Sequence, residues 1–187
     1  MRRSTIAVHV ALAWLAAAPF AASAQQMPHP YGPDVGLDVA RRAADAALAE
    51  ARKNGWTVAA AVVDTHGDLV YFEKLENTQY GSIRVAQEKA RTAANFKRPT
   101  KAFEDAIASG KNNFLGLPGA IPLEGGIPLF ADGKVIGAIG VSGATSAQDG
   151  QCAKAGTEAV GGAPPAAAAP AAPAAPAAPA AAAPVKK

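Results

Sequence analysis

Residues 125–143 read GGIPLFADGKVIGAIGVSG and predict a β-hairpin. The pair Asp132-Gly133 separates two apolar runs, and Asp-Gly is a strong signal for a hairpin turn because glycine tolerates positive φ. The second run is apolar at both odd and even positions, so both of its faces must be covered. The hairpin therefore predicts a sheet with helices above and below it.

The segments before and after this hairpin supply the other layers. A similar hairpin is expected over 57–72, around a turn at 64–68. Apolar residues recur at helical spacing from Leu37 to the Asn54-Gly55 end, and again from Ser82 to a break at Arg98-Pro99. Thr100 is expected to cap a third helix, and a last helix is expected from Ser146. The predicted order is α-β-β-α-α-β-β-α, an α/β sandwich with an antiparallel sheet, in which 111–124 is an irregular connection.

The first 24 residues are predicted to be a signal peptide. Arg2 and Arg3 precede an apolar run over 6–20, and Ala22-Ser23-Ala24 is a small-residue cleavage site. The apolar run is short for a membrane span, and no later segment approaches its length, so no transmembrane segment is expected. We expect a mature protein that begins near Gln25 and is periplasmic or secreted.

The rest of the chain divides into three parts. Residues 25–36 form an extended arm rich in proline and glycine, and 37–162 form one domain. Residues 163–187 are almost entirely alanine and proline, a composition that predicts a disordered tail with no core of its own. The alternative for the tail is a polyproline stalk that presents the domain, or its two terminal lysines, to an anionic envelope surface.

Charge and cysteine content exclude some functions. Two of the 18 Lys and Arg residues lie in the first 24 residues and two close the chain, which leaves 14 against 15 acidic residues. This near-neutral domain offers no argument for nucleic-acid binding. Cys152 is the only cysteine, so no intramolecular disulfide forms. It is either a small buried hydrophobe or an intersubunit bridge.

Several separated blocks of the sequence resemble one known family. They are VVDTHG over 62–67, EKARTA over 88–93, FKRPT over 96–100, GGIP over 125–128 and IGAIGVSG over 136–143, followed by Asp149. In this order they resemble the GlcG/HbpS-like haem-binding family, also known as DUF336, across about residues 37–160.

The resemblance implies a fold, an assembly and a cofactor. Members of the family share a profilin-like α/β/α fold with helices on both faces of the sheet, and they commonly form homo-oligomers. Members described as haem-binding include secreted haem-responsive proteins and a domain attached to propanediol-utilisation cobalamin enzymes. The resemblance therefore implies haem as a cofactor, although many members have no established activity.

The polar and glycine residues of the matched blocks are the candidate ligand-binding residues. A lysine together with backbone amides suits a carboxylate or a haem propionate. We therefore expect a pocket for haem or another small acidic ligand where these residues meet. The alternative is that the polar members form a structural ion pair and helix caps. The candidates are Lys89, Arg98, Thr100, Gly125, Gly126, Ser142, Gly143 and Asp149.

Two histidines of the mature chain are candidate ligands for haem iron. His66 lies in the turn at 64–68 and His29 in the arm, and either needs a hydrogen-bonded partner to be a good ligand. There is no Cys-x-x-Cys-His motif for covalent haem attachment. Glu73 and Glu76 have E-x-x-E spacing, and their hard oxygen donors could bind a ferric or divalent metal ion. The alternative is that they are two solvated loop carboxylates without a metal.

Three classes of function are compatible with these patterns. The first and favoured class is an exported homo-oligomer that binds haem or a similar acidic ligand and is not an enzyme. The second is an enzyme or accessory protein that acts on a small oxidised organic acid, although no nucleophile–base pair, P-loop or dinucleotide fingerprint is recognisable. The third is an interaction module carried on the Pro/Ala stalk.

Overall fold

The computed structural model describes residues 29–161, so the predicted signal peptide and the Ala/Pro tail lie outside the described residues. The predicted order of helices and strands is confirmed, and a 3-10 helix, η1, is added within the 111–124 connection. The elements are α1 (Leu37–Lys53), β1 (Ala59–Val63), β2 (Leu69–Lys74), α2 (Tyr80–Phe96), α3 (Lys101–Ala108), η1 (Asn112–Gly116), β3 (Gly126–Ala131), β4 (Lys134–Ser142) and α4 (Ser146–Glu158).

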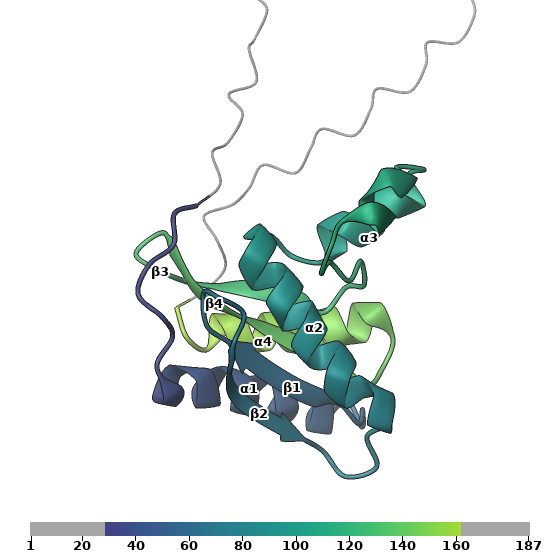
Figure 1. Cartoon of the computed structure of the whole chain (residues 1–187). Coiled ribbons are helices and arrows are strands. Elements are labelled where there is room, and N and C mark those ends of the chain that lie inside the picture. The colour runs from purple at the N-terminus through teal and green to yellow at the C-terminus, as the bar shows by residue number, and fades with distance from the viewer. Residues whose placement is uncertain (1–28, 162–187) are drawn as a thin grey trace, which may run out of the picture.

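The four strands form one antiparallel sheet in the order β2-β1-β4-β3. Helix α2 packs on one face, and α1 and α4 pack side by side on the other (Figure 1). Every residue of β1 is buried, as expected for a central strand that is apolar on both faces. The predicted α/β sandwich with helices on both faces is therefore confirmed.

Small residues bring α2 close to the sheet. Ala86 and Ala90 pack over Gly140 of β4, and a Cβ at Gly140 would collide with the backbone of both alanines. Glycine in a strand interior weakens the strand, so its presence here is explained by the close approach of the helix. Helix α2 therefore lies close enough to the sheet for its polar side chains to reach the end of β4.

The other face holds the larger part of the core. Leu48 of α1, Val58, and Ile139 and Val141 of β4 are buried there, together with alanines of α1. Gly156 of α4 lies against Ala43 of α1, and a Cβ at Gly156 would be 2.6 Å from the Ala43 carbonyl oxygen. Glycine at this position sets the close packing of α1 against α4.

Helix α3 and η1 project from the main body (Figure 1). Phe103 is the one buried residue of α3, and its ring makes edge contacts with Phe96 and Phe114 at centroid distances of 5.4 and 5.8 Å. Thr100 occupies the N-cap position of α3, as predicted, but the capping bond expected from its side chain is absent. Thr100 has helical φ and ψ and makes no side-chain cap, because its hydroxyl bonds to Gly126 instead.

The arm runs across the end of the sheet that carries both hairpin turns. The Gly32 N–H donates to the Val135 carbonyl at 2.8 Å, and the Val35 N–H donates to Ile136 at 2.7 Å. Further along, the Asp34 carboxylate accepts from the N–H of Thr65 in the β1–β2 turn. The arm is therefore part of the folded domain from about residue 30 onward.

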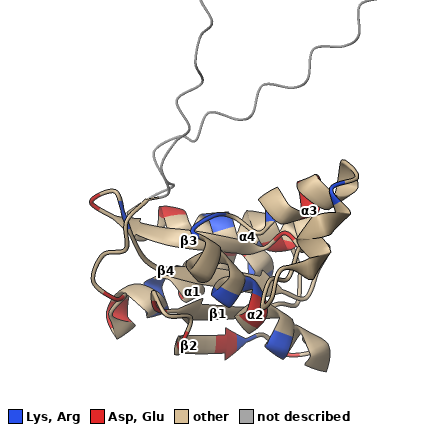
Figure 2. Cartoon of the chain, turned by 45° about the horizontal axis from the view of Figure 1, so that its top comes forward, with Lys and Arg blue, Asp and Glu red and all other residues tan. Residues whose placement is uncertain are grey.

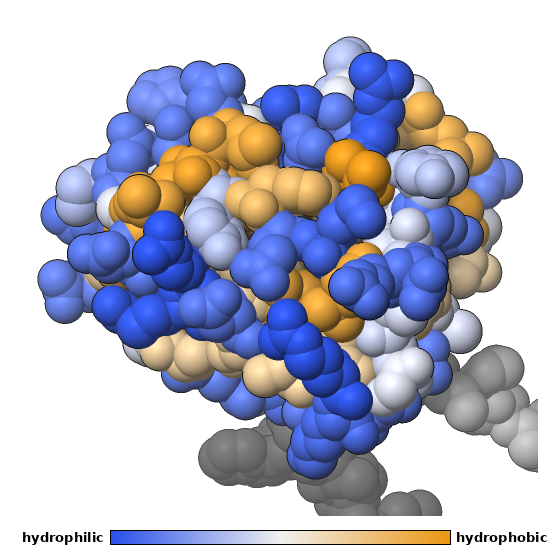
Figure 3. All heavy atoms as spheres, turned by 90° about the horizontal axis from the view of Figure 1, so that it is seen from below, coloured by the Kyte–Doolittle hydropathy of each residue, from blue (hydrophilic) through white to orange (hydrophobic). Residues whose placement is uncertain are grey.

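Charged and apolar side chains are mixed over the surface. Lys and Arg are interspersed with Asp and Glu over the chain drawn in Figure 2. On the face seen from below, apolar side chains lie in groups between polar and charged ones (Figure 3). None of the helices among residues 29–161 is long and apolar enough to cross a membrane.

Candidate functional site

Two of the predicted ligand-binding residues pair with each other in the interior. Lys89 of α2 donates from Nζ to Asp149 Oδ2 of α4 at 2.7 Å and to the Val141 carbonyl at 3.1 Å. The two side chains are 2% and 3% exposed. Asp149 Oδ1 accepts from the Ala144 N–H at 3.0 Å. Burial raises the pKa of Asp149, while Lys89 acts in the opposite direction. The geometry is that of a structural ion pair, the alternative that the sequence left open.

Thr100 and the two glycines surround this pair. Thr100 Oγ1 accepts from the Gly126 N–H at 2.9 Å, and the Thr100 N–H donates to the Gly126 carbonyl at 2.9 Å. Gly125 has φ of 128°, and a Cβ there would lie 2.7 Å from the Val141 oxygen and 2.9 Å from Lys89 Nζ. The backbone thus closes tightly over the ion pair, and only glycine fits at Gly125.

The remaining predicted residues lie at different distances from this centre. Ser142 is buried at the end of β4, and Gly143 follows it against the carbonyl of Thr57. Arg98 lies elsewhere, since its Nε donates to the Phe96 carbonyl at 3.3 Å and its guanidinium stacks over Phe103. The fold therefore brings together all the predicted residues of the matched blocks except Arg98.

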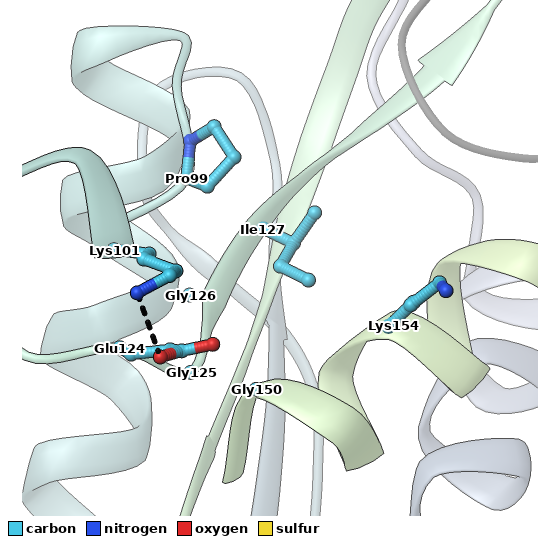
Figure 4. A pocket seen from close by; sticks show the side chains of 8 residues that line it. All are labelled: Pro99, Lys101, Glu124, Gly125, Gly126, Ile127, Gly150 and Lys154. Atoms are coloured by element: carbon cyan, nitrogen blue, oxygen red, sulfur yellow. Dashed lines mark ion pairs between the residues drawn. The ribbon is translucent and has the colours of Figure 1, made fainter. Parts of the chain in front are cut away.

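Gly125, which lies against the ion pair, also lines a small cavity that we call the Gly125 pocket (Figure 4). Its volume is about 160 Å³, and Lys101 Nζ lies 3.5 Å from Glu124 Oε2 at its rim. Cavities that hold cofactor-sized ligands have volumes of about 300–1,000 Å³, so this pocket does not enclose a haem. The lining residues are Pro99, Lys101, Glu124, Gly125, Gly126, Ile127, Gly150 and Lys154.

A larger cavity, which we call the Trp56 groove, lies at the opposite edge of the sheet. It has a volume of about 520 Å³ and is formed where α1 ends, β1 begins and β2 ends. Pairing of Ala59 with Lys74 brings these segments together. Trp56 and Leu75 are partly buried against the core, and Arg52, Gly55, Thr57, Lys74 and Glu76 complete the lining.

Charges of both signs lie around the Trp56 groove. Arg52 forms an ion pair with Glu73 at 3.5 Å, and Glu73 also accepts from the Tyr71 hydroxyl at 2.8 Å. Glu76 lines the groove, whereas Glu73 does not. No carboxylate of residues 29–161 lies within ion-pair distance of Lys74. The groove thus offers an aromatic wall and two cations to a planar acidic ligand.

Both candidate histidines lie at the other end of the sheet, where the hairpin turns are. The His29 ring packs against Phe130, and its Nδ1 lies 3.2 Å from the Gly133 carbonyl oxygen. His66 is 77% exposed, and its Nδ1 lies 3.9 Å from Asp34 Oδ1. The β1 strand separates His66 from the Trp56 groove, so neither histidine lines either cavity.

The fold gives Cys152 the surroundings of an inert thiol. It is fully buried in the core between α4 and α1. Burial raises the pKa of Cys152 to about 12. Of the two predicted alternatives, the structure of this chain agrees with the small buried hydrophobe.

Sequence reasoning missed most of the residues that line both cavities. Trp56 and Lys74 are 18 positions apart and carry no motif, so only strand pairing shows that they meet. Glu124 and Lys154 were also missed. The one available signal was the position of Glu124 directly before the Gly125-Gly126 pair.

Comparison with known proteins places this architecture among described relatives. A family model described as "Haem degrading protein HbpS-like" matches residues 35–158. Protein GlcG of Escherichia coli K12 is 42% identical over 91 residues, which is 49% of this chain and 68% of GlcG. An uncharacterised 15.0 kDa protein of Citrobacter freundii is 30% identical over 108 residues, or 56% of this chain and 76% of that protein.

Solved structures agree with these sequence matches. A double mutant of HbpS from Streptomyces reticuli superposes with a TM-score of 0.64 at 33% identity, covering 78% of this chain and 99% of HbpS. A complex of PduOC with haem gives a TM-score of 0.62 at 25% identity, covering 68% of this chain and 96% of PduOC. With the family model matching most of the described fold, the chain belongs to the HbpS-like family.

Proposed function

We propose that this protein binds haem without a covalent bond, in the Trp56 groove. The observation that carries the proposal is the size and chemistry of the groove: about 520 Å³, an indole and a leucine on its walls, and Arg52 and Lys74 at its edge. The solved complex of a structural relative, PduOC, with haem supports haem as the ligand. Haem supplies a redox-active iron when it is bound.

The groove residues fit the two parts of a haem separately. Trp56 presents an aromatic surface to the porphyrin ring, and aromatic rings stack favourably in offset geometry. Arg52 and Lys74 provide cations for two propionates, and Arg52 can bind a carboxylate through two hydrogen bonds. No His, Met, Cys or Tyr lines the groove, so we expect the haem to be held by its ring and propionates.

A haemin titration tests this proposal. The Soret band of haemin should shift and saturate at one haemin per chain. Trp56 is the only tryptophan after residue 24, so its fluorescence should be quenched along the same titration curve. Added imidazole should shift the Soret band again, because no histidine of the chain occupies the iron. A titration with no saturable shift would overturn haem binding itself.

Variants with matched controls locate the site. The double variant Arg52→Gln/Lys74→Gln should weaken haemin binding about tenfold or more, and the change of two exposed side chains leaves the core untouched. Arg42→Gln/Lys53→Gln removes the same charge from exposed positions outside the groove and should leave the affinity unchanged. His29→Ala and His66→Ala should also bind normally. Loss of binding in either histidine variant would move the site to the hairpin end of the sheet.

We also propose that residues 1–24 direct export, so that haem is bound in the periplasm or outside the cell. The basic start, the apolar run and the Ala-Ser-Ala site support this proposal. Cell fractionation with N-terminal sequencing tests it, and the mature chain should begin at Gln25. An intact N-terminus in the cytoplasmic fraction would contradict export.

A further inference from the structure

The Gly125 pocket has the properties of a second ligand site. We propose that it binds a compact organic carboxylate of about six non-hydrogen atoms. The site is distinct from the Trp56 groove, since the two cavities share no residue and lie at opposite edges of the sheet. Its occupation does not depend on haem.

The volume of the pocket limits the size of the ligand. A cavity of about 150 Å³ lined by apolar side chains holds one benzene molecule, which has six carbon atoms. The Gly125 pocket measures about 160 Å³. Three of its lining residues are glycines, Gly125, Gly126 and Gly150, so backbone atoms form much of its wall and leave this space open.

Gly125, which lines the pocket, has a backbone N–H without a partner in the described part of the chain. Gly125 is buried, and its N–H makes no hydrogen bond to residues 29–161, although its carbonyl accepts from the Val141 N–H at 2.9 Å. The neighbouring Gly126 N–H is already bonded to Thr100. A buried donor without a partner is costly, and a ligand that brings an acceptor oxygen would remove this cost.

Two lysines favour an anionic acceptor. Lys101 and Lys154 come from α3 and α4 and lie on opposite sides of the pocket (Figure 4). Glu124 is the one acidic residue in the lining, and Lys101 pairs with it at 3.5 Å. Outside the lining, Lys101 also contacts Asp105 and Lys154 contacts Glu158, both in exposed ion pairs of small strength. The lining itself carries a net positive charge.

The apolar wall favours an organic anion over an inorganic one. Pro99 and Ile127 contribute hydrocarbon side chains, and Ile127 lies between the two lysines (Figure 4). Sulfate or phosphate would leave this wall in contact with polar oxygens, whereas the body of a short branched acid would cover it. The carboxylate would then lie near the Gly125 N–H.

Isobutyrate is a suitable probe because it has six non-hydrogen atoms, a branched apolar body and one carboxylate. Titration of ¹⁵N-labelled protein should shift the Gly125 amide proton downfield and saturate with a Kd of about 1 mM or tighter. Isobutyramide has the same shape without the charge and should bind at least about fivefold more weakly. Equal affinity for the amide would overturn the anionic site, and the absence of a saturable shift would overturn the site altogether.

Two variants assign the binding to this pocket. In Gly150→Ala the new Cβ would collide with the Glu124 side chain and push it into the cavity, while alanine is the better helix former at this position of α4. Isobutyrate binding should fall about tenfold, with no loss of thermal stability. Lys154→Gln should weaken binding about threefold or more, while Lys111→Gln, an exposed position outside the pocket, should not.

The same samples separate this inference from haem binding. Gly150→Ala should bind haemin like the unchanged protein, because the Trp56 groove is intact in it. Unchanged isobutyrate binding in Gly150→Ala would show that the carboxylate binds elsewhere and would overturn the proposal, whatever the result with haemin.

Discussion

Lys89 and Asp149 lie 60 positions apart in the sequence and meet at 2.7 Å with almost no exposure to solvent. The pair joins α2, on one face of the sheet, to α4, on the other face, just beyond the end of β4. Removing two charges from water costs free energy. A buried ion pair offsets this cost only when the other hydrogen-bonding atoms of both charged groups also have partners. Here Val141 and Ala144 provide them.

The first prediction concerns this pair. Lys89→Met or Asp149→Asn should each lower the free energy of unfolding by about 3–5 kcal/mol, because each leaves one buried charge unpaired. The double variant should cost clearly less than the sum of the two. Urea unfolding measures all three.

The Glu88–Arg91 pair is the matched control. Its N–O distance is also 2.7 Å, but its side chains are 37% and 38% exposed. Glu88→Gln should therefore change the free energy of unfolding by less than about 1 kcal/mol. Equal effects of Glu88→Gln and Asp149→Asn would contradict the importance of burial.

The second prediction concerns the hydroxyl of Thr100. Thr100→Val keeps the shape of the side chain but removes the acceptor of the buried Gly126 N–H. An unsatisfied buried donor costs about 1–3 kcal/mol, and we expect a loss of this size in chemical unfolding. Thr57→Val, at an exposed position, should stay within about 0.5 kcal/mol of the unchanged protein.

The third prediction concerns Cys152. Because burial raises the pKa of its thiol to about 12, the thiol should not react with a thiol reagent at pH 8 until the protein unfolds. Stability from burying the neutral thiol is present below its ordinary pKa of 9.0 and is lost as the pH rises toward 12. Rapid labelling of the folded protein at pH 8 would show that Cys152 is accessible.

The fourth prediction concerns assembly. The resemblance to the family implies a homo-oligomer, and α3, η1 and the following loop leave Leu115 and Leu123 64% and 41% exposed. Light scattering at micromolar concentration should give a mass that is a multiple of the mature chain. Leu115→Ser/Leu123→Ser should reduce that mass, because it removes two exposed apolar side chains that a second copy would cover. A monomer in the unchanged protein would contradict the prediction.

The fold was predictable because its signals are local. The Asp132-Gly133 turn, the apolar strands and the break at Arg98-Pro99 each act within a few residues, and the structure confirms the elements built on them. The N-cap position of Thr100 was predicted correctly, but the bond of its hydroxyl was not, because a side-chain cap and a bond to a distant glycine have the same local sequence.

The cavities were not predictable because their lining residues are far apart in the sequence. Trp56 and Lys74 meet only because β1 pairs with β2, and Gly125 meets Lys154 only because α4 packs beside β3. The resemblance pointed to Lys89 and Asp149, but the direction of their side chains depends on how closely α2 approaches Gly140.

The bonds between Thr100 and Gly126 also limit where a second copy of this chain could pair with the edge of the sheet. Thr100 occupies the outward N–H and carbonyl of Gly126 on the edge strand β3, and two positions on, Pro128 has no N–H to offer. Among residues 29–161 the edge strands are β2 and β3, and only β3 carries such a block, over its first residues. A second copy of the chain that adds as a strand is therefore expected to pair with β2 and not with the first half of β3.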